Sequence, residues 1–182
     1  MTAQAEIGGA RGVRGWRIAV WGVAALLLLA PAVATQLSDE MQWDAGDFIL
    51  VGAMLLAGCG LWELAIRKSS SRTYGAGAGV AVAAAFLLFL VNGAVGIVGS
   101  EDEPVNLIYL GVIAVAVIGA VIARFRPRGM ARAMAVTAGA QVLAGAVAVT
   151  LVPDIRGFLL GTALFAPIWL LAAWLFHKAA RN

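Results

Sequence analysis

Three side chains with a carboxyl or amide group lie well inside otherwise apolar stretches of this sequence, and any chemistry within these stretches would have to begin there. They are Glu63, Asn92 and Gln141. Because polar groups are costly in hydrocarbon, the three residues form a candidate polar path for an ion or small solute. The simpler interpretation is structural, since amides in lipid commonly form hydrogen bonds between helices. Glu63 also precedes Arg67 by four positions, the favourable order for an ion pair on one helix face.

Acidic residues gather at the turns between apolar stretches and form a second candidate site. The segment VGSEDEPVN, residues 98–106, places three acids side by side. Such a surface attracts cations, but a bound hard cation needs several oxygens converging at about 2.0 to 2.6 Å. The simpler interpretation is that the acids keep these turns in water and complement basic residues elsewhere. The candidate outer cation attractor consists of Glu101, Asp102, Glu103, Asp44 and Asp47.

Motifs of the common enzyme classes are missing from the sequence. It has no P-loop, no His-Glu-x-x-His and no nucleotide-binding fingerprint, and His177 and Cys59 are each the single residue of their type. We therefore expect no enzymatic activity, no catalytic residue, no cofactor and no metal site. The basic segment RFRPRGMAR, residues 124–132, is better explained by contact with anionic lipid headgroups than with nucleic acid.

Composition assigns these residues to a membrane protein. The 182 residues are 62% hydrophobic and 13% charged, whereas in a soluble domain about a quarter of all residues are charged. Runs of about 20 apolar residues must be helical in lipid, because lipid cannot bind free backbone groups. We predict an all-α, polytopic transmembrane bundle forming one domain over residues 1–182. Its six helices are expected at 18–36, 48–66, 75–99, 107–123, 133–152 and 157–176.

The charges of the connecting segments alternate along the chain. Twelve of the 13 basic residues fall on one predicted side, and eight of the ten acids on the other. The positive-inside rule then predicts that both termini are cytoplasmic. Aromatic residues near the ends of the predicted spans suggest an interfacial belt; they are Trp16, Trp62, Tyr74, Tyr109, Trp169 and Trp174.

The first apolar run admits two interpretations. RGVRGWR followed by an apolar run, with Ala32 and Ala34 as a small-residue pair, has the order of a cleaved secretory signal. The run is nevertheless long for a signal, so residues 1–34 are either a retained helix or a signal. The other five spans keep their orientation in both cases.

Self-similarity hints at an internal repeat. GAVGIVGSED from Gly93 aligns with GAVAVTLVPD from Gly145, and each ends in an aspartate. Three tandem helical hairpins would produce this pattern.

The segment LLFLVNGAVGIVGSEDEPVNLIYLGVIAVAVIGAVIARFRPRGMARAM resembles uncharacterised small multi-pass proteins of the bacterial inner membrane. The likeness covers residues 41–150, and its most specific parts are Asn92 with the Gly-Ser-Glu-Asp turn and the ARFRPRGMAR loop. The resemblance implies a multi-helix bacterial inner-membrane protein and brings no activity, cofactor or catalytic residue.

Three functional hypotheses follow. The first is a non-enzymatic accessory or interaction protein whose partners are the lipid bilayer, anionic headgroups at the cytoplasmic loops, and a membrane protein or a second copy. The second is a small channel or transporter for a cation or small solute, with an acidic outer vestibule. A lipid-modifying enzyme ranks third, because few ionisable groups lie within the spans.

The predicted topology can be checked with reporter fusions. Alkaline phosphatase, which is active only outside the cytoplasm, should be active when fused after Pro104 and inactive when fused after Gly129, because the intervening span carries the chain back across the membrane. Activity at Gly129 and none at Pro104 would overturn the assigned orientation.

Overall fold

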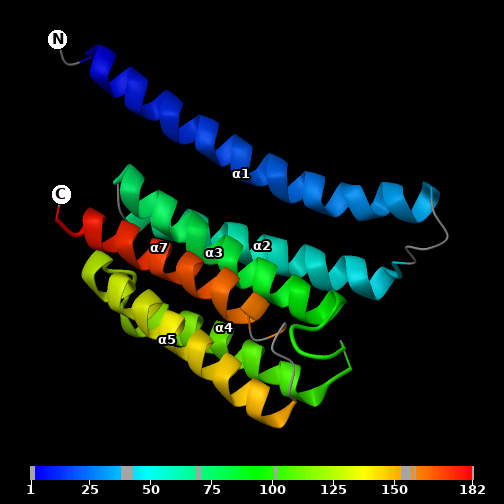
Figure 1. Ribbon diagram of the computed structural model, residues 1–182. Coiled ribbons are helices and arrows are strands. Elements are labelled where there is room, and N and C mark those ends of the chain that lie inside the picture. The colour runs from blue at the N-terminus through cyan, green and yellow to red at the C-terminus, as the bar shows by residue number, and fades with distance from the viewer. Residues whose placement is uncertain are drawn as a thin grey trace. The chain divides into compact units, whose positions relative to one another are not determined.

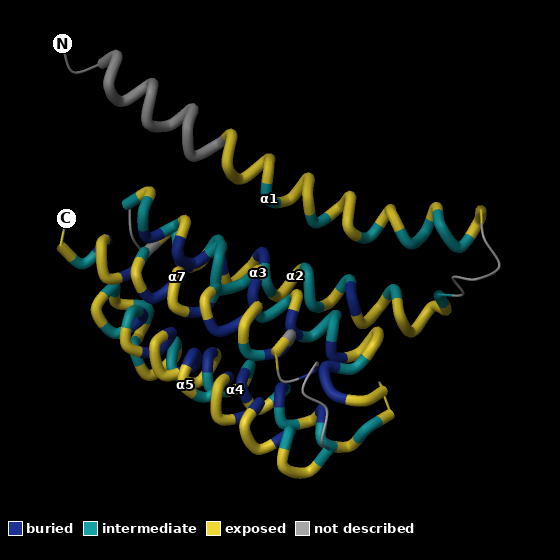
Figure 2. Tube along the Cα trace, viewed as in Figure 1, coloured by how far each residue is buried: buried dark blue, intermediate teal, exposed yellow. Residues whose placement is uncertain are grey.

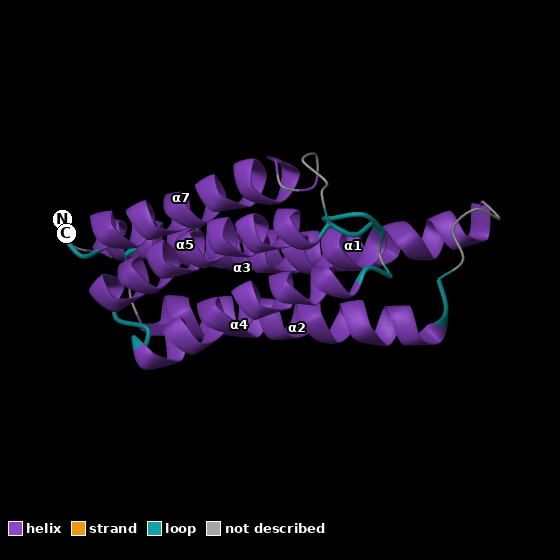
Figure 3. Ribbon diagram, turned by 60° about the horizontal axis from the view of Figure 1, so that its bottom comes forward, coloured by secondary structure: helices purple, strands orange, loops and turns teal. Residues whose placement is uncertain are grey.

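The computed structural model of the chain describes residues 3–37, 43–68, 71–100, 102–152, 157 and 159–181. These residues form helices joined by short turns, with no strand among them (Figures 1 and 3). Six helical segments are long and apolar enough to cross a membrane, so the predicted all-α transmembrane architecture is confirmed. The helices are α1 (Ala3–Leu37), α2 (Ala45–Lys68), α3 (Arg72–Ala94), α4 (Leu107–Ile122), α5 (Pro127–Leu151) and α7 (Phe165–Ala179).

Two short elements each lead into a longer helix. A 3₁₀ turn, η1 (Pro104–Asn106), leads into α4, and a π-helical segment, η2 (Leu160–Leu164), leads into α7. A π-helix offsets the regular pairing of backbone groups and frequently occurs at functional sites.

Several helix ends differ from the prediction, and two of the differences change the turns of the second unit. The third span was expected to reach residue 99, but α3 ends at Ala94. The fifth was expected from residue 133, but α5 begins at Pro127, because proline suits the first helical position, where its missing N–H costs nothing. The basic residues Arg128 and Arg132 therefore stand on the first turns of α5 and not in a loop.

The chain divides into two compact units between Glu63 and Leu64, within α2. In the first unit α1 and α2 form an antiparallel hairpin. The Leu28 side chain fills the space beside Gly52, 3.9 Å from where a Cβ would lie, and Arg17 pairs with Glu63. Both contacts keep the same register, because each helix advances eleven residues between them.

The second unit is a bundle of four antiparallel helices. α5 packs extensively on both α7 and α4, α3 packs on α7, and α3 and α4 contact each other over a smaller area (Figure 1). Consecutive helices thus run antiparallel, as hairpins require, although α3 has its main contacts with α7 and not with its neighbour in sequence.

Burial in this bundle follows the pattern of a protein in lipid. Large apolar residues such as Ile122 and Leu143 are exposed, whereas alanines and four polar residues, Asn92, Asn106, Thr137 and Gln141, are buried. Figure 2 shows buried positions along the inner sides of α3, α5 and α7. Lipid gives apolar side chains no reason to turn inward, so small residues that permit close packing share the interior with a few large ones such as Trp169 and Phe165.

Glycine allows the closest helix contacts. A Cβ at Gly119 of α4 would lie 2.9 Å from the Ala133 Cβ of α5, and one at Gly77 of α3 would lie 3.2 Å from the Leu175 Cβ of α7. Both distances are shorter than ordinary van der Waals contact. Backbone approach at these points therefore depends on the absence of a side chain.

The turn after α3 also needs glycine. Gly96 and Gly99 adopt φ values of +69° and +70°, a region that residues with a Cβ rarely enter. A Cβ at Gly96 would also collide with the Ser100 carbonyl oxygen. The two glycines end α3 before the predicted residue 99.

Asn106 holds this turn with a buried side chain. Its Oδ1 accepts hydrogen bonds from the N–H groups of Ile97 and Val98 at 3.1 and 3.0 Å. Its Nδ2 donates to the Val98 and Ser100 carbonyls at 3.1 and 2.7 Å. One side chain therefore satisfies four backbone groups that no helix serves.

Replacing this side chain tests its role. Asn106→Leu should lower the free energy of unfolding by about 2 to 4 kcal/mol, because it leaves buried amide and carbonyl groups unsatisfied. Thermal unfolding of the purified protein in detergent measures the loss. Asn106→Asp should be intermediate, since a carboxylate accepts from both amides but donates to neither carbonyl. Wild-type stability for Asn106→Leu would contradict this role.

Candidate functional site

The candidate acids of the first unit are used locally. The Asp47 amide donates to Asp44 Oδ1, and the Asp44 amide donates to Asp47 Oδ2, both at 3.0 Å. This reciprocal arrangement is a capping box at the start of α2. Negative charge at this position also complements the positive end of the helix dipole. Both acids therefore have a structural role that requires no cation.

The acids of the second unit lie in the turn between α3 and η1. Asp102 is exposed and Glu103 is half-buried, with the Glu103 Cγ against Gly99. Glu101, the remaining member of the predicted attractor, lies outside the described residues. In the part of the chain that the structure describes, no three His, Cys, Asp or Glu side chains converge as a metal site would require.

Glu63, the charged member of the candidate polar path, belongs to the first unit. Its Oε1 lies 2.6 Å from a guanidinium nitrogen of Arg17 on α1, and its side chain is 14% exposed. The pair joins the two helices of the hairpin, a role that sequence spacing did not indicate. The predicted pair with Arg67 stays a prediction.

Gln141, the second member, is fully buried on α5. Its Nε2 donates to the carbonyl oxygen of Gly161 at 3.0 Å. Gly161 lies in the π-helical segment before α7, so the bond joins α5 to a point where the backbone pattern changes. This is the interhelical hydrogen bond that the structural interpretation of Gln141 expects.

Asn92, the third member, is buried near the end of α3. Gly77 contacts Phe176 on α7, and the buried residues Ala84, Leu88 and Asn92 continue the same stripe towards the end of α3. Asn92 is fifteen residues beyond Gly77, and Gly161 is fifteen residues before Phe176. In this antiparallel pair, Asn92 is therefore level with the π-helical segment that Gln141 binds.

The bundle thus brings two predicted residues, Asn92 and Gln141, to the same level around Gly161. Asn92 Oδ1 and Gln141 Oε1 are buried and have no hydrogen-bond partner among the described residues. Amide oxygens are good acceptors for water, for N–H and O–H donors and for monovalent cations. The layer is therefore polar but carries no formal charge.

Tyr109 belongs to this layer, although the sequence pointed elsewhere. It was expected in an interfacial belt but is fully buried, with its hydroxyl 3.1 Å from where a Cβ of Gly161 would lie. The belt interpretation is also wrong for Trp62, Tyr74 and Trp169, which are buried, whereas Trp16 and Trp174 are exposed. Contacts between helices decide which aromatic residues of α3, α4 and α7 are buried, and the sequence of a single span does not reveal those contacts.

The opposite end of the second unit is basic. The Tyr74 hydroxyl of α3 donates to the Phe125 carbonyl at 2.6 Å, and its ring meets Phe176 of α7 edge-on at 5.0 Å. These contacts bring together the start of α3, the α4–α5 turn and the end of α7. Arg124 and Phe125 adopt left-handed φ values of 49° and 57°, an uncommon conformation for residues with side chains.

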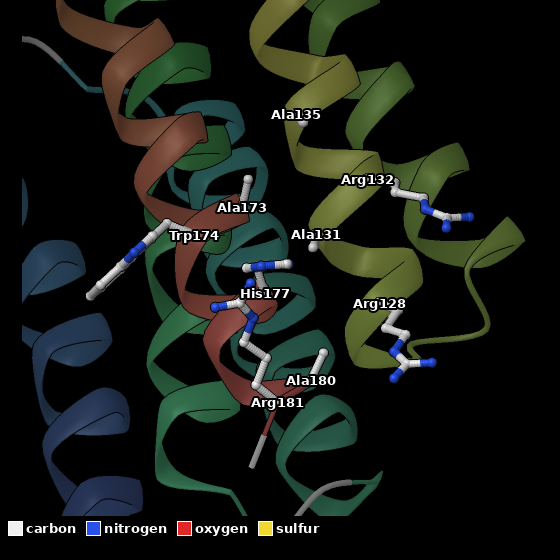
Figure 4. A pocket seen from close by; sticks show the side chains of 9 residues that line it. All are labelled: Arg128, Ala131, Arg132, Ala135, Ala173, Trp174, His177, Ala180 and Arg181. Carbon is white, nitrogen blue, oxygen red and sulfur yellow. The ribbon is translucent and has the colours of Figure 1, made fainter.

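A groove of about 690 Å³ opens at this basic end between the start of α5 and the end of α7, and alanines form its walls. Figure 4 shows His177 and Ala131 beside the space between the two helices, whereas Arg128 and Arg132 extend from the side of α5 that faces away from α7. Lys178 lies over the Trp174 ring, with Nζ 5.3 Å from the ring centre. We call it the basic groove; its lining residues are Arg128, Ala131, Arg132, Ala135, Ala173, Trp174, His177, Ala180 and Arg181.

The charge pattern of the sequence places these basic residues on one side of the membrane but does not indicate that α5 and α7 pair to form a groove. Nor does the sequence pattern predict Asn106 and Tyr109 as buried polar residues. Asn106 left a weak signal, because it directly follows Pro104 and Val105 at the start of an apolar run. No pattern in the sequence indicated the π-helical segment at Gly161.

The six apolar helices and the small-residue interior define an integral, multi-pass membrane protein. Comparison of the chain with protein-family models, with curated proteins and with solved structures finds no match.

The two amides should respond differently to substitution. Gln141→Leu is expected to lower stability by roughly 1 kcal/mol, because it removes an interhelical hydrogen bond. Asn92→Leu should leave stability unchanged or raise it, because it removes a buried amide that gains no compensating bond within the described protein. Thermal unfolding of both variants in detergent makes the comparison. A larger loss for Asn92→Leu than for Gln141→Leu would indicate that Asn92 holds a bound solute or ion.

Proposed function

We propose that this chain is a non-enzymatic accessory protein of the bacterial inner membrane that binds another membrane protein. The observation that carries the proposal is the use of the polar residues in the second unit. Asn106 orders a turn, Gln141 joins two segments, and Thr137 donates to the Ala133 carbonyl of its own helix at 2.9 Å. The buried polar residues described there are uncharged, which supports a packing role over acid or base catalysis.

The helix α1 offers the surface for a partner. Only 6% of its most apolar window is buried, compared with at least 22% in each other span. Its residues Ile18, Leu26, Leu29 and Val33 are exposed at helical spacing, with Gly22 in the same row. A small residue within an apolar row permits close approach of another helix. The partner is then a second membrane protein or a second copy of this chain, with anionic headgroups at the basic loops.

Transport of a cation or small solute is the second candidate function. Two observations favour it: the buried oxygens of Asn92 and Gln141 without a partner among the described residues, and their common level beside the π-helical segment. Polar groups at a break in a membrane helix are a recurring feature of transport sites. Asp102 and Glu103 would then belong to an acidic outer vestibule.

Purification in a mild detergent from native membranes tests the accessory role. A stoichiometric partner should be retained by the wild-type protein and lost from Gly22→Leu, because the new side chain obstructs close helix approach. Gly60→Leu on α2 is the matched control and should retain the partner. Both glycines have open space where a Cβ would lie, so neither variant should disturb the fold.

Two results would contradict the accessory role. One is a wild-type protein that purifies alone as a monomer. The other is cation flux into proteoliposomes above that of empty vesicles, reduced by Asn92→Leu, which would favour transport.

A further inference from the structure

The basic groove combines positive charge with an apolar wall. Arg128 and Arg132 on α5 and His177 and Arg181 on α7 line its edges, and alanines form its walls. In the part of the chain that the structure describes, none of these four side chains forms an ion pair with a carboxylate. The positive charge of the three arginines is therefore available to an external anion.

The basic residues of α7 lie at the end of their helix, whereas those of α5 lie at the start. His177 and Lys178 stand in the last turn of α7, where positive charge complements the negative end of the helix dipole. Arg128 and Arg132 stand on the first turns of α5, which has no acidic residue in its first turn, so the dipole opposes them. The helix itself thus explains the bases of α7 but not the two arginines of α5.

The apolar part of the groove distinguishes between a soluble anion and a lipid. Ala135 and Trp174 line the groove, and the neighbouring residues Val136, Leu170 and Leu171 are exposed on the same two helices. Because α5 and α7 are both membrane-spanning helices, this surface continues from the charged end into the hydrocarbon. A free phosphate would use only the charged end, whereas a phospholipid would use both.

We propose that the basic groove is a binding site for an anionic phospholipid. The phosphate and any further negative group of its head lie among Arg128, Arg132 and Arg181, where arginine forks suit phosphate oxygens. An acyl chain follows the alanine wall past Trp174 towards the exposed apolar face. The site rests on the proposed membrane placement but not on the accessory role, so each can fail without the other.

Lipid-dependent thermal stabilisation of the full-length protein in detergent tests this site. Dioleoyl phosphatidylglycerol should stabilise the wild-type protein more than dioleoyl phosphatidylcholine, which has the same chains and no net charge. The double variant Arg128→Gln, Arg132→Gln should weaken the phosphatidylglycerol effect roughly tenfold in apparent affinity, since each basic residue near an anionic surface contributes to lipid attraction.

Matched variants separate a defined site from general surface charge. Arg72→Gln with Arg126→Gln removes the same charge from the same end of the bundle but outside the groove, and should leave affinity within about twofold. Ala135→Phe keeps all charges and fills the groove, and should weaken binding as the double groove variant does. It also serves as the test if that variant does not fold.

Three outcomes would overturn the proposal. Equal losses in the groove and control variants would indicate a diffuse basic surface. Equal stabilisation by the two lipids would indicate a purely apolar effect. Complete displacement of phosphatidylglycerol by inorganic phosphate would identify a site for a soluble anion.

Discussion

Hydrocarbon offers hydrogen-bonding groups no partner, and this constraint accounts for most of the architecture. Backbone groups are satisfied within helices that are long enough to cross a membrane. Where the helix stops after Ala94, the four hydrogen bonds of Asn106 take over the same task. Where α7 begins with a π-helical segment, Gln141 binds the Gly161 carbonyl. Polar side chains inside the bundle thus serve the backbone wherever regular helix is interrupted.

The same constraint explains why many glycines and alanines lie in the interior of the second unit, beside large residues such as Trp169 and Phe165. Apolar burial gives helices little reason to associate in lipid, so close van der Waals packing must supply it. Gly119 against Ala133 and Gly77 against Leu175 are the points where a side chain would not fit. Large residues such as Ile122 face outward, where lipid accommodates them.

The two ends of the second unit use their charged residues differently. At the end with Asp102 and Glu103, a compact turn is ordered by backbone and amide hydrogen bonds. At the other end, the arginines beside the basic groove make no ion pair within the described protein and remain accessible. The basic end therefore supports interaction with an external anion. The described part of the acidic turn, by contrast, has no converging ligands for a cation.

The sequence by itself determined the number of helices, because runs of apolar residues and the charges between them depend only on composition along the chain. It also pointed to Asn92 and Gln141 as the polar residues of the interior. Only the tertiary structure decided that they share a level beside Gly161, that Tyr109 is buried there, that Glu63 pairs with Arg17, and that α5 and α7 enclose a basic groove. These relations join residues far apart in the chain, and they depend on the rotation and register of each helix. Such weakly amphipathic, alanine-rich helices do not encode rotation or register locally.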